Sequence, residues 1–273
     1  MGGYLCESNR TMIVKPSIFV SKLRSVLFTI TNRIDNNNNA DYVTNGEECF
    51  LNGYFSFLSD AVTLFDVGGN IGEYSQMLIA TSNNKNLNYS LHIFEPTSSC
   101  FETLKKKYGS NKSVCLNNVG LSDSNKNAFI YYDSEKSGFA SLYKRELSIE
   151  NVQMDKKELI SLIRMEEYIE KNNIKHIDFM KIDIEGHEIS AFEGMGKYLN
   201  SDFVKAIQFE YGGVNLDSKT TLREIFRVLE NAGFTICKIM KRGIEVRPYI
   251  IQMENYQYAN YVAISKKIFP SLK

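Results

Sequence analysis

The sequence predicts an α/β protein with a Rossmann-like, open and mostly parallel seven-stranded sheet, helices on both faces and an antiparallel hairpin at one edge. From residue 62 onward, short apolar runs alternate with stretches of helical spacing, which is the pattern of βαβ units. Right-handed crossovers place the helices on both faces of such a sheet. The last two apolar runs follow each other without a helix between them, and this predicts the hairpin.

Each element is predicted from its local pattern. Strands are expected at short apolar runs bounded by turn residues, at 62–67, 91–94, 114–119, 177–182, 204–209, 234–239 and 261–264, with 128–132 pairing beside the third strand. Helices are expected where apolar residues recur at helical spacing, at 71–80, 98–108, 188–199 and 222–231. The polar run 36–39 separates these elements from a helix at about 16–32. The chain therefore divides into an N-terminal helical arm (1–60) and one domain (61–273).

Composition and charge exclude several classes of protein. The 32 Lys and Arg residues balance the 32 Asp and Glu residues, which argues against a nucleic-acid partner. The five cysteines are scattered and show no CxxC spacing, so neither a disulfide framework nor a cysteine zinc site is predicted. The first residues lack the pattern of a secretory signal, and a cytoplasmic protein is expected.

The most apolar stretch near the N-terminus covers residues 13–30. Lys15, Lys22 and Arg24 interrupt it, so no transmembrane segment is expected. We expect this stretch to pack on its own domain. The alternatives are a helix that lies on a surface or on a partner, including a homodimer formed through the N-terminal arm.

The strongest motif, FDVGGNIGEYS, follows the first predicted strand. Gly68 and Gly72 frame a tight strand-to-helix turn, where the backbone can approach a ligand closely. A dinucleotide fingerprint requires glycine where Asn70 and Glu73 stand, and no Lys-Ser/Thr pair completes a phosphate loop. Glu73 and Asp66 favour a ligand that carries positive charge and no phosphate, such as S-adenosylmethionine. The alternative is an ordinary glycine turn.

The second predicted strand ends in Phe94-Glu95-Pro96. An acidic side chain at this place can accept hydrogen bonds from the ribose hydroxyls of an adenosine. A glutamate at a strand end can also be merely solvated. The glycine turn upstream favours a contact with a ligand.

A third motif places Asp183, Glu185, His187 and Glu188 at the end of a buried strand, with Gly186 allowing the chain to turn. Such residues can simply cap a helix or form a surface salt network. Carboxylates around one histidine also permit proton transfer or cation binding.

These motifs resemble the FkbM family of class I S-adenosylmethionine-dependent methyltransferases, from Asp66 to about Ser265. The resemblance rests on FDVGGNIGEYS, FEP, NVGLSD, SGFASLY and, most specifically, DFMKIDIEGHEISAFEGMGKYL. It implies S-adenosylmethionine as the cofactor. By matching position, it implies that the cofactor is held by Asp66, Gly68, Asn70, Gly72, Glu95, Ser122, Asp123 and Asp183.

Methyl transfer from a sulfonium requires the nucleophile, methyl group and sulfur to be collinear, and an alcohol nucleophile benefits from a base. His187 is the first candidate for that base, with Asp183 and Glu185 as orienting groups or alternates. A divalent ion held by Asp183, Glu185 and Glu188 is conceivable but not favoured, so no metal ligands are assigned.

The segment 133–147 is expected to form a lid or the wall of the acceptor site. Tyr143 offers a stacking face, while Lys144 and Arg145 could meet an acidic group or remain solvated. Glu210 belongs to a loosely matched set that is assigned to the acceptor. The resemblance implies O-methylation of a sugar, glycan precursor or natural product, as in polysaccharide biosynthesis. The alternatives are N-methylation of a small metabolite and a catalytically silent cofactor-binding or assembly module.

Overall fold

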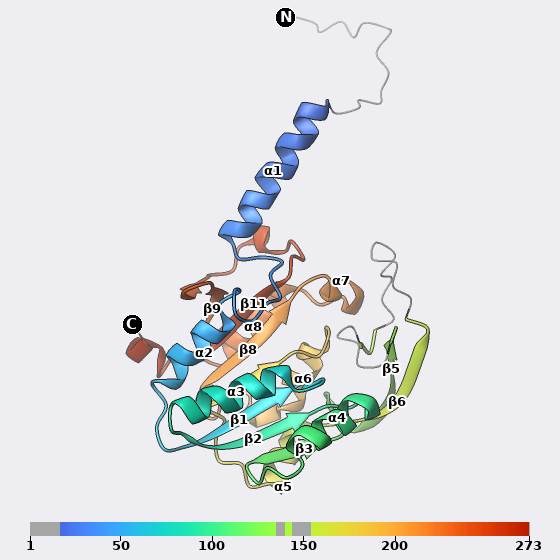
Figure 1. Cartoon of the computed structure of the whole chain (residues 1–273), viewed down its shortest axis with the longest axis vertical. Helices are drawn as coiled ribbons and strands as arrows, with labels where there is room; N and C mark the ends of the chain where they lie inside the picture. The colour runs from blue at the N-terminus through green and yellow to red at the C-terminus, as the bar shows by residue number, and fades with distance from the viewer. Residues whose placement is uncertain (1–16, 135–139, 144–153, 273) are drawn as a thin grey trace, which may run out of the picture.

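The computed structural model describes residues 17–134, 140–143 and 154–272 (Figure 1). The strands of its main sheet are β1 (Ala61–Val67), β2 (Asn88–Phe94), β3 (Val114–Asn117), β7 (Phe179–Ile182), β8 (Ala206–Tyr211), β9 (Phe234–Met240), β10 (Gly243–Val246) and β11 (Ala259–Ser265). A second sheet contains β4 (Gly120–Leu121), β5 (Lys126–Tyr132) and β6 (Lys156–Ile163). The helices are α1 (Ile18–Ile34), α2 (Glu47–Phe55), α3 (Glu73–Asn84), α4 (Ser98–Tyr108), α5 (Met165–Lys171), α6 (Glu188–Gly194), α7 (Val214–Ser218) and α8 (Leu222–Asn231). Short 3₁₀ turns are η1 (Gly196–Tyr198), η2 (Ile251–Met253) and η3 (Phe269–Leu272).

The main sheet confirms the predicted α/β class, with the strand order β10-β9-β11-β8-β7-β1-β2-β3. Strands β8, β7, β1, β2 and β3 are parallel. The described part of the sheet has eight strands and not seven, because β10 folds back antiparallel on β9. The last two predicted strands do pair antiparallel, but β11 lies between β8 and β9, so the hairpin at the edge is β9–β10.

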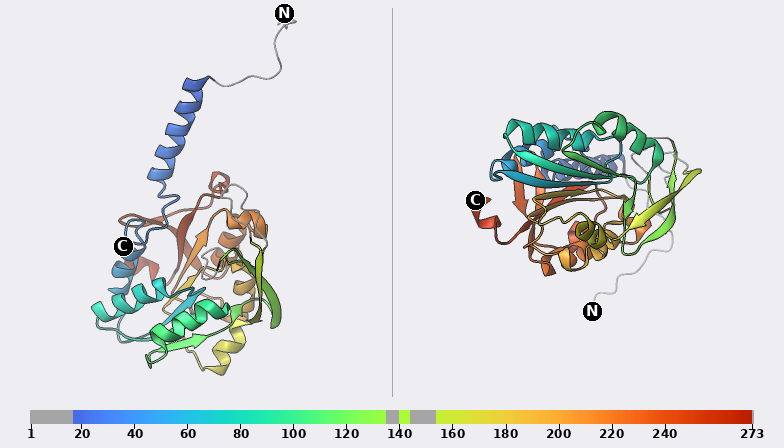
Figure 2. Two further views of the ribbon diagram at one scale, coloured as in Figure 1. Left: turned by 45° about the vertical axis from the view of Figure 1, so that its right-hand side comes forward. Right: turned by 90° about the horizontal axis from the view of Figure 1, so that it is seen from below.

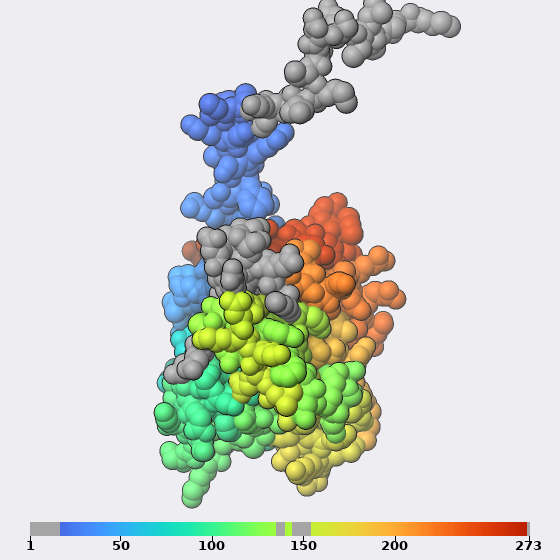
Figure 3. All heavy atoms as spheres, turned by 90° about the vertical axis from the view of Figure 1, so that its right-hand side faces the viewer, coloured from blue at the N-terminus to red at the C-terminus, as the bar shows by residue number. Residues whose placement is uncertain are grey.

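The second sheet corrects one expectation. Residues 128–132 belong to β5, which pairs antiparallel with β6, and not to the main sheet beside β3. The sequence of β6 alternates inward Ile160 and Leu162 with outward side chains, and these two residues form a small core with Ile130. Figure 3 shows β5 and β6, in green to yellow-green, on the face turned toward the viewer.

Helices cover both faces of the main sheet, as predicted (Figure 2). One hydrophobic cluster joins α2, α3 and α4 to one face, and another joins α5, α6 and α8 to the other. Helices α4 and α8 match their predicted ranges. The helix predicted at 188–199 is shorter, because α6 ends at Gly194 and Gly196 takes a φ of 51°.

The N-terminal region consists of two unlike parts. Residues of α2 such as Phe50 and Tyr54 belong to the hydrophobic core of the sheet. Helix α1 contains no buried residue, so the expectation that it packs on its own domain is wrong. The expectation failed because an amphipathic pattern identifies an apolar face but not the surface that covers it. No helix in the described ranges is long and apolar enough to cross a membrane.

Candidate functional site

The glycine turn ties three neighbouring strands together. Gly68 has a φ of 87°, and a Cβ at this position would lie 1.8 Å from the carbonyl oxygen of Asp183, which follows β7. The backbone N–H groups of Gly68 and Gly69 donate to the carbonyl oxygen of Phe94, at 2.9 and 3.0 Å. Only glycine fits at position 68, because a side chain would push the ends of β1 and β7 apart.

Glu95 fastens the loop after β2 to the glycine turn. One carboxylate oxygen accepts from the backbone N–H of Asn70 at 2.8 Å. The other accepts from the backbone N–H and the hydroxyl of Thr97, at 2.9 and 2.6 Å. Burial raises the pKa of Glu95, although these hydrogen bonds oppose the rise. A carboxylate offers about four acceptor sites, so about one is left for a ligand.

Asp66 lies at the end of β1 and is 1% exposed. Its carboxylate accepts a hydrogen bond from the hydroxyl of Ser75 in α3. Burial raises the pKa of Asp66 from 3.8 to about 6. Burial therefore disfavours the ionised form of this carboxyl group.

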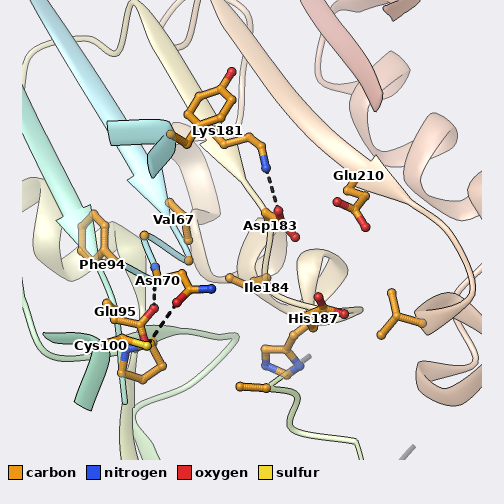
Figure 4. A pocket seen from close by; sticks show the side chains of 18 of the residues that line it. Val67, Asn70, Phe94, Glu95, Cys100, Lys181, Asp183, Ile184, His187 and Glu210 are labelled. Atoms are coloured by element: carbon orange, nitrogen blue, oxygen red, sulfur yellow. Dashed lines mark hydrogen bonds and ion pairs between the residues drawn. The ribbon is translucent and has the colours of Figure 1, made fainter. Parts of the chain in front are cut away.

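Lys181 and Asp183 form an ion pair at the end of β7, with 2.8 Å between the ammonium nitrogen and a carboxylate oxygen (Figure 4). Lys181 is 4% exposed, and its ammonium lies 5.0 Å from the ring centroid of Tyr74. Burial opposes the charge of Lys181, but the nearby carboxylates, Asp183 foremost, raise its pKa well above the ordinary value. The prediction of site residues missed Lys181, although it stands inside the most specific motif.

Glu210 comes from β8, the next strand of the sheet, and faces the same space as Asp183 (Figure 4). Burial and the negative charges of Asp183 and Glu185 raise its pKa well above the ordinary value. Asp183 was predicted for catalysis and Glu210 for the acceptor. The two side chains face the same space, and the charge of one acts on the other.

His187 is buried where α6 begins and uses both ring nitrogens. Its Nε2 lies 2.9 Å from the hydroxyl oxygen of Ser122, and its Nδ1 lies 3.1 Å from the hydroxyl oxygen of Tyr143. The hydroxyl of Ser122 donates to the carboxylate of Asp123 at 2.7 Å. Because that hydroxyl has one proton, Nε2 carries the imidazole proton and Nδ1 accepts from Tyr143. Burial lowers the pKa of His187 from 6.5 to about 4, so the ring is neutral at pH 7.

The turn between β7 and α6 is held by Glu188. Its carboxylate accepts from the backbone N–H groups of Ile184 and Gly186, both at 3.2 Å. Glu185 takes a φ of 53°, and its carbonyl oxygen accepts from the hydroxyl of Ser141 at 2.9 Å. Within the described ranges, no group of three or more His, Cys, Asp or Glu side chains is arranged to hold a metal ion.

A cavity of about 600 Å³ lies at the carboxyl ends of β1, β2, β7 and β8. The predicted site residues that line it are Asp66, Gly68, Asn70, Glu95, Asp183, Glu185, His187 and Glu210. Those described but outside its lining are Gly72, Ser122, Asp123 and Tyr143, the last three joined to the cavity through His187. Lys144 and Arg145 lie outside the described residues.

Several parts of the cavity wall were not predicted. The second sheet contributes an apolar wall of Ile130, Ile160 and Leu162, and the segment after α1 contributes Tyr42. The alternation of β6 was a usable signal for the first. No local signal marks Tyr42, because its place depends on how residues 36–60 pack on the sheet.

A protein-family model agrees with the motifs. The model of the methyltransferase FkbM domain matches residues 66–236. The methyltransferase FkbM from Methylobacillus flagellatus KT is 14% identical with a TM-score of 0.47, over 89% of this chain and 60% of that chain. The precorrin-6y C5,15-methyltransferase from Geobacter metallireducens GS-15 is 11% identical with a TM-score of 0.41, over 84% of this chain and 93% of that chain. No curated protein matches. Because the family model spans more than half of its length, the chain belongs to the FkbM family of class I S-adenosylmethionine-dependent methyltransferases.

Proposed function

We propose that the chain transfers the methyl group of S-adenosylmethionine to a hydroxyl group of a small-molecule or glycan acceptor. The observation that carries this proposal is the cavity at the ends of the parallel strands. The glycine turn and Glu95 line one side of it, and Asp183, Glu210 and His187 line the other (Figure 4). In open α/β sheets, ligands bind at this end of the strands.

The residues present fit the proposed cofactor. The cavity is within the range of about 300–1,000 Å³ that is usual for small-molecule sites. Glu95 keeps about one acceptor site for a ribose hydroxyl. The apolar wall of Ile130, Ile160 and Leu162 suits an adenine ring, while Asp66 and Asn70 border the space for the methionine end. S-adenosylmethionine would supply a methyl group activated by the sulfonium charge.

The chain itself must receive the proton that an acceptor hydroxyl loses. A histidine with a pKa of about 4 and two engaged nitrogens is a weak base at pH 7. Glu210 faces the cavity beside Asp183, and its ionised carboxylate is the stronger base because its pKa is raised. In this proposal His187 is a positioning residue, since it lines the cavity and forms hydrogen bonds with the hydroxyl groups of Ser122 and Tyr143.

The acceptor class follows from the family resemblance and from the chemistry of the wall. A hydroxyl of a sugar, glycan precursor or natural product is neutral and can donate a hydrogen bond to the carboxylates at Asp183 and Glu210. The balanced net charge does not favour a nucleic-acid acceptor.

The test is a transfer assay with methyl-labelled S-adenosylmethionine and a panel of nucleotide-sugars, glycans, natural-product alcohols and small amines. Label on an acceptor oxygen supports the proposal, whereas label on nitrogen identifies an N-methyltransferase. If the cofactor binds in calorimetry but no acceptor is labelled, the binding or assembly module is the better description. A parallel assay in a chelator decides whether a divalent ion is needed.

A further inference from the structure

Helix α1 is an amphipathic element that nothing in the described chain covers. Its 17 residues include none that is buried, and Phe19, Leu27 and Ile34 are 74%, 55% and 68% exposed. Figures 1 and 3 show it standing away from the sheet and its helices. Such a run of exposed apolar side chains indicates a surface that is used for binding.

The side chains of α1 are sorted around the helix. At 3.6 residues per turn, one face about 120° wide carries only apolar residues. These are Phe19, Val20, Leu23, Val26, Leu27, Ile30 and Ile34, whereas Ile18 and Phe28 lie outside this face. Lys22 and Arg33 border the face on one side and Arg24 borders it on the other. The opposite side carries Ser21, Ser25, Thr29 and Asn32 together with Ile18 and Phe28.

The charge of α1 is of one sign. The helix contains three basic residues and no Asp or Glu, as its sequence IFVSKLRSVLFTITNRI shows. The acidic residue that follows it, Asp35, forms an ion pair with Arg247 at 3.2 Å. An apolar face bordered by basic side chains is complementary to a bilayer that exposes anionic headgroups.

We propose that α1 lies in the surface of an anionic lipid bilayer, with its apolar face among the acyl chains and Lys22, Arg24 and Arg33 at the headgroups. A second copy of the chain is the competing occupant, since Val20, Leu23, Leu27, Ile30 and Ile34 have heptad spacing. Pairing of two such helices would leave Lys22, Arg24 and Arg33 without acidic partners, because the helix contains no Asp or Glu. An anionic lipid surface buries the apolar face and also pairs the three basic side chains with anionic headgroups.

The bound helix would also keep the cavity near the bilayer. Asn36 fixes the end of α1 to the sheet, because its side-chain amide donates to the carbonyl oxygens of Asn45 and Ile239, at 2.6 and 3.0 Å. Asn38, Ala40 and Tyr42, which follow directly, line the cavity. The docking itself does not depend on the proposed function.

The test is co-sedimentation of the full chain with phosphatidylcholine vesicles that contain or lack phosphatidylglycerol. We expect binding to the anionic vesicles and much weaker binding to pure phosphatidylcholine. Replacing Lys22, Arg24 and Arg33 by Gln should weaken binding about a hundredfold, since each basic residue contributes about fivefold near an anionic surface. Replacing Leu23, Leu27 and Ile30 by Gln should abolish it, and Ser21→Gln with Ser25→Gln should leave it unchanged.

Calorimetric binding of S-adenosylmethionine, together with circular dichroism, shows whether each variant is folded. Equal binding to both kinds of vesicle, or no binding to either, would overturn the proposal. The proposal would also be overturned if the wild type does not bind lipid but forms a dimer in light scattering, and if the variant of Leu23, Leu27 and Ile30 is a monomer.

Discussion

The two sides of the cavity are built in different ways. On the side of the glycine turn, hydrogen bonds hold the two carboxyl groups: Asn70 and Thr97 donate to Glu95, and Ser75 donates to Asp66. On the side of Asp183, a buried cation lies among carboxylates that come from separate strands. The first side depends on hydrogen bonds to carboxyl groups, and the second depends on the interactions of a buried cation with carboxylates. Loss of Glu95 on the first side should therefore weaken ligand binding, whereas damage to the second side should affect stability and turnover.

The largest expected effect is on stability, from Lys181→Met. This change leaves Asp183, whose side chain is 30% exposed, without its cation beside Glu210, and the expected cost is at the lower end of the about 3–5 kcal/mol that is typical of a buried ion pair. The free energy of unfolding from urea denaturation measures the loss. The matched control is Lys197→Met, whose partner Glu170 is at the surface and whose urea midpoint should hardly move. Similar midpoints for the two variants would remove the distinction between the two sides.

The next effect is a pH dependence that comes from Asp66. Its pKa is raised from 3.8 unfolded to about 6 folded, so the folded state binds the proton more tightly. Stability from this group is present below pH 4 and is lost as the pH rises through 6, by about 3 kcal/mol in total. The wild type loses this stability between pH 4 and pH 8, and Asp66→Asn does not. The free energy of unfolding of Asp66→Asn should therefore rise by about 3 kcal/mol relative to that of the wild type over this range.

Urea denaturation of the ligand-free protein at both pH values measures this gain. The control is Asp155→Asn, at an exposed position. Its free energy of unfolding should differ from that of the wild type by the same amount at both pH values. A constant difference between Asp66→Asn and the wild type across the range would contradict the assignment of a buried, proton-binding carboxyl.

A third prediction concerns turnover. Glu210→Gln removes the proposed proton acceptor and should lower kcat about a hundredfold while the affinity for S-adenosylmethionine is retained. Glu193→Gln, on the exposed side of α6, is the matched control. The same loss in His187→Asn, with Glu210→Gln near wild type, would return the role of base to the histidine.

The smallest of these effects is expected at Glu95. Glu95→Gln loses charge-assisted hydrogen bonds on the side of the glycine turn, worth about 2 kcal/mol, and should weaken cofactor binding about thirtyfold. Calorimetry measures the affinity, and kcat at saturating cofactor should change little. Glu102→Gln, exposed on α4, is the control. If Glu95→Gln changes only kcat and not the affinity for the cofactor, the distinction between a binding side and a catalytic side is wrong.

Much of the fold could be predicted because its signals are local. The ranges of α4 and α8 follow from apolar residues at helical spacing, and β1 follows from a short apolar run before a glycine turn. The place of β11 between β8 and β9 could not be predicted, because the order of strands depends on pairing between distant segments. The second sheet was missed for the same reason.

The amino-acid sequence by itself determined the α/β class, the glycine turn and the family, since these depend on residue types at fixed spacing. Only the tertiary structure brought Glu210 beside Asp183, engaged both nitrogens of His187 and left α1 uncovered. The physical reason is that burial and charge act through space. A pKa or an exposed apolar face depends on every element packed nearby, and the spacing of residues along the chain does not specify those neighbours.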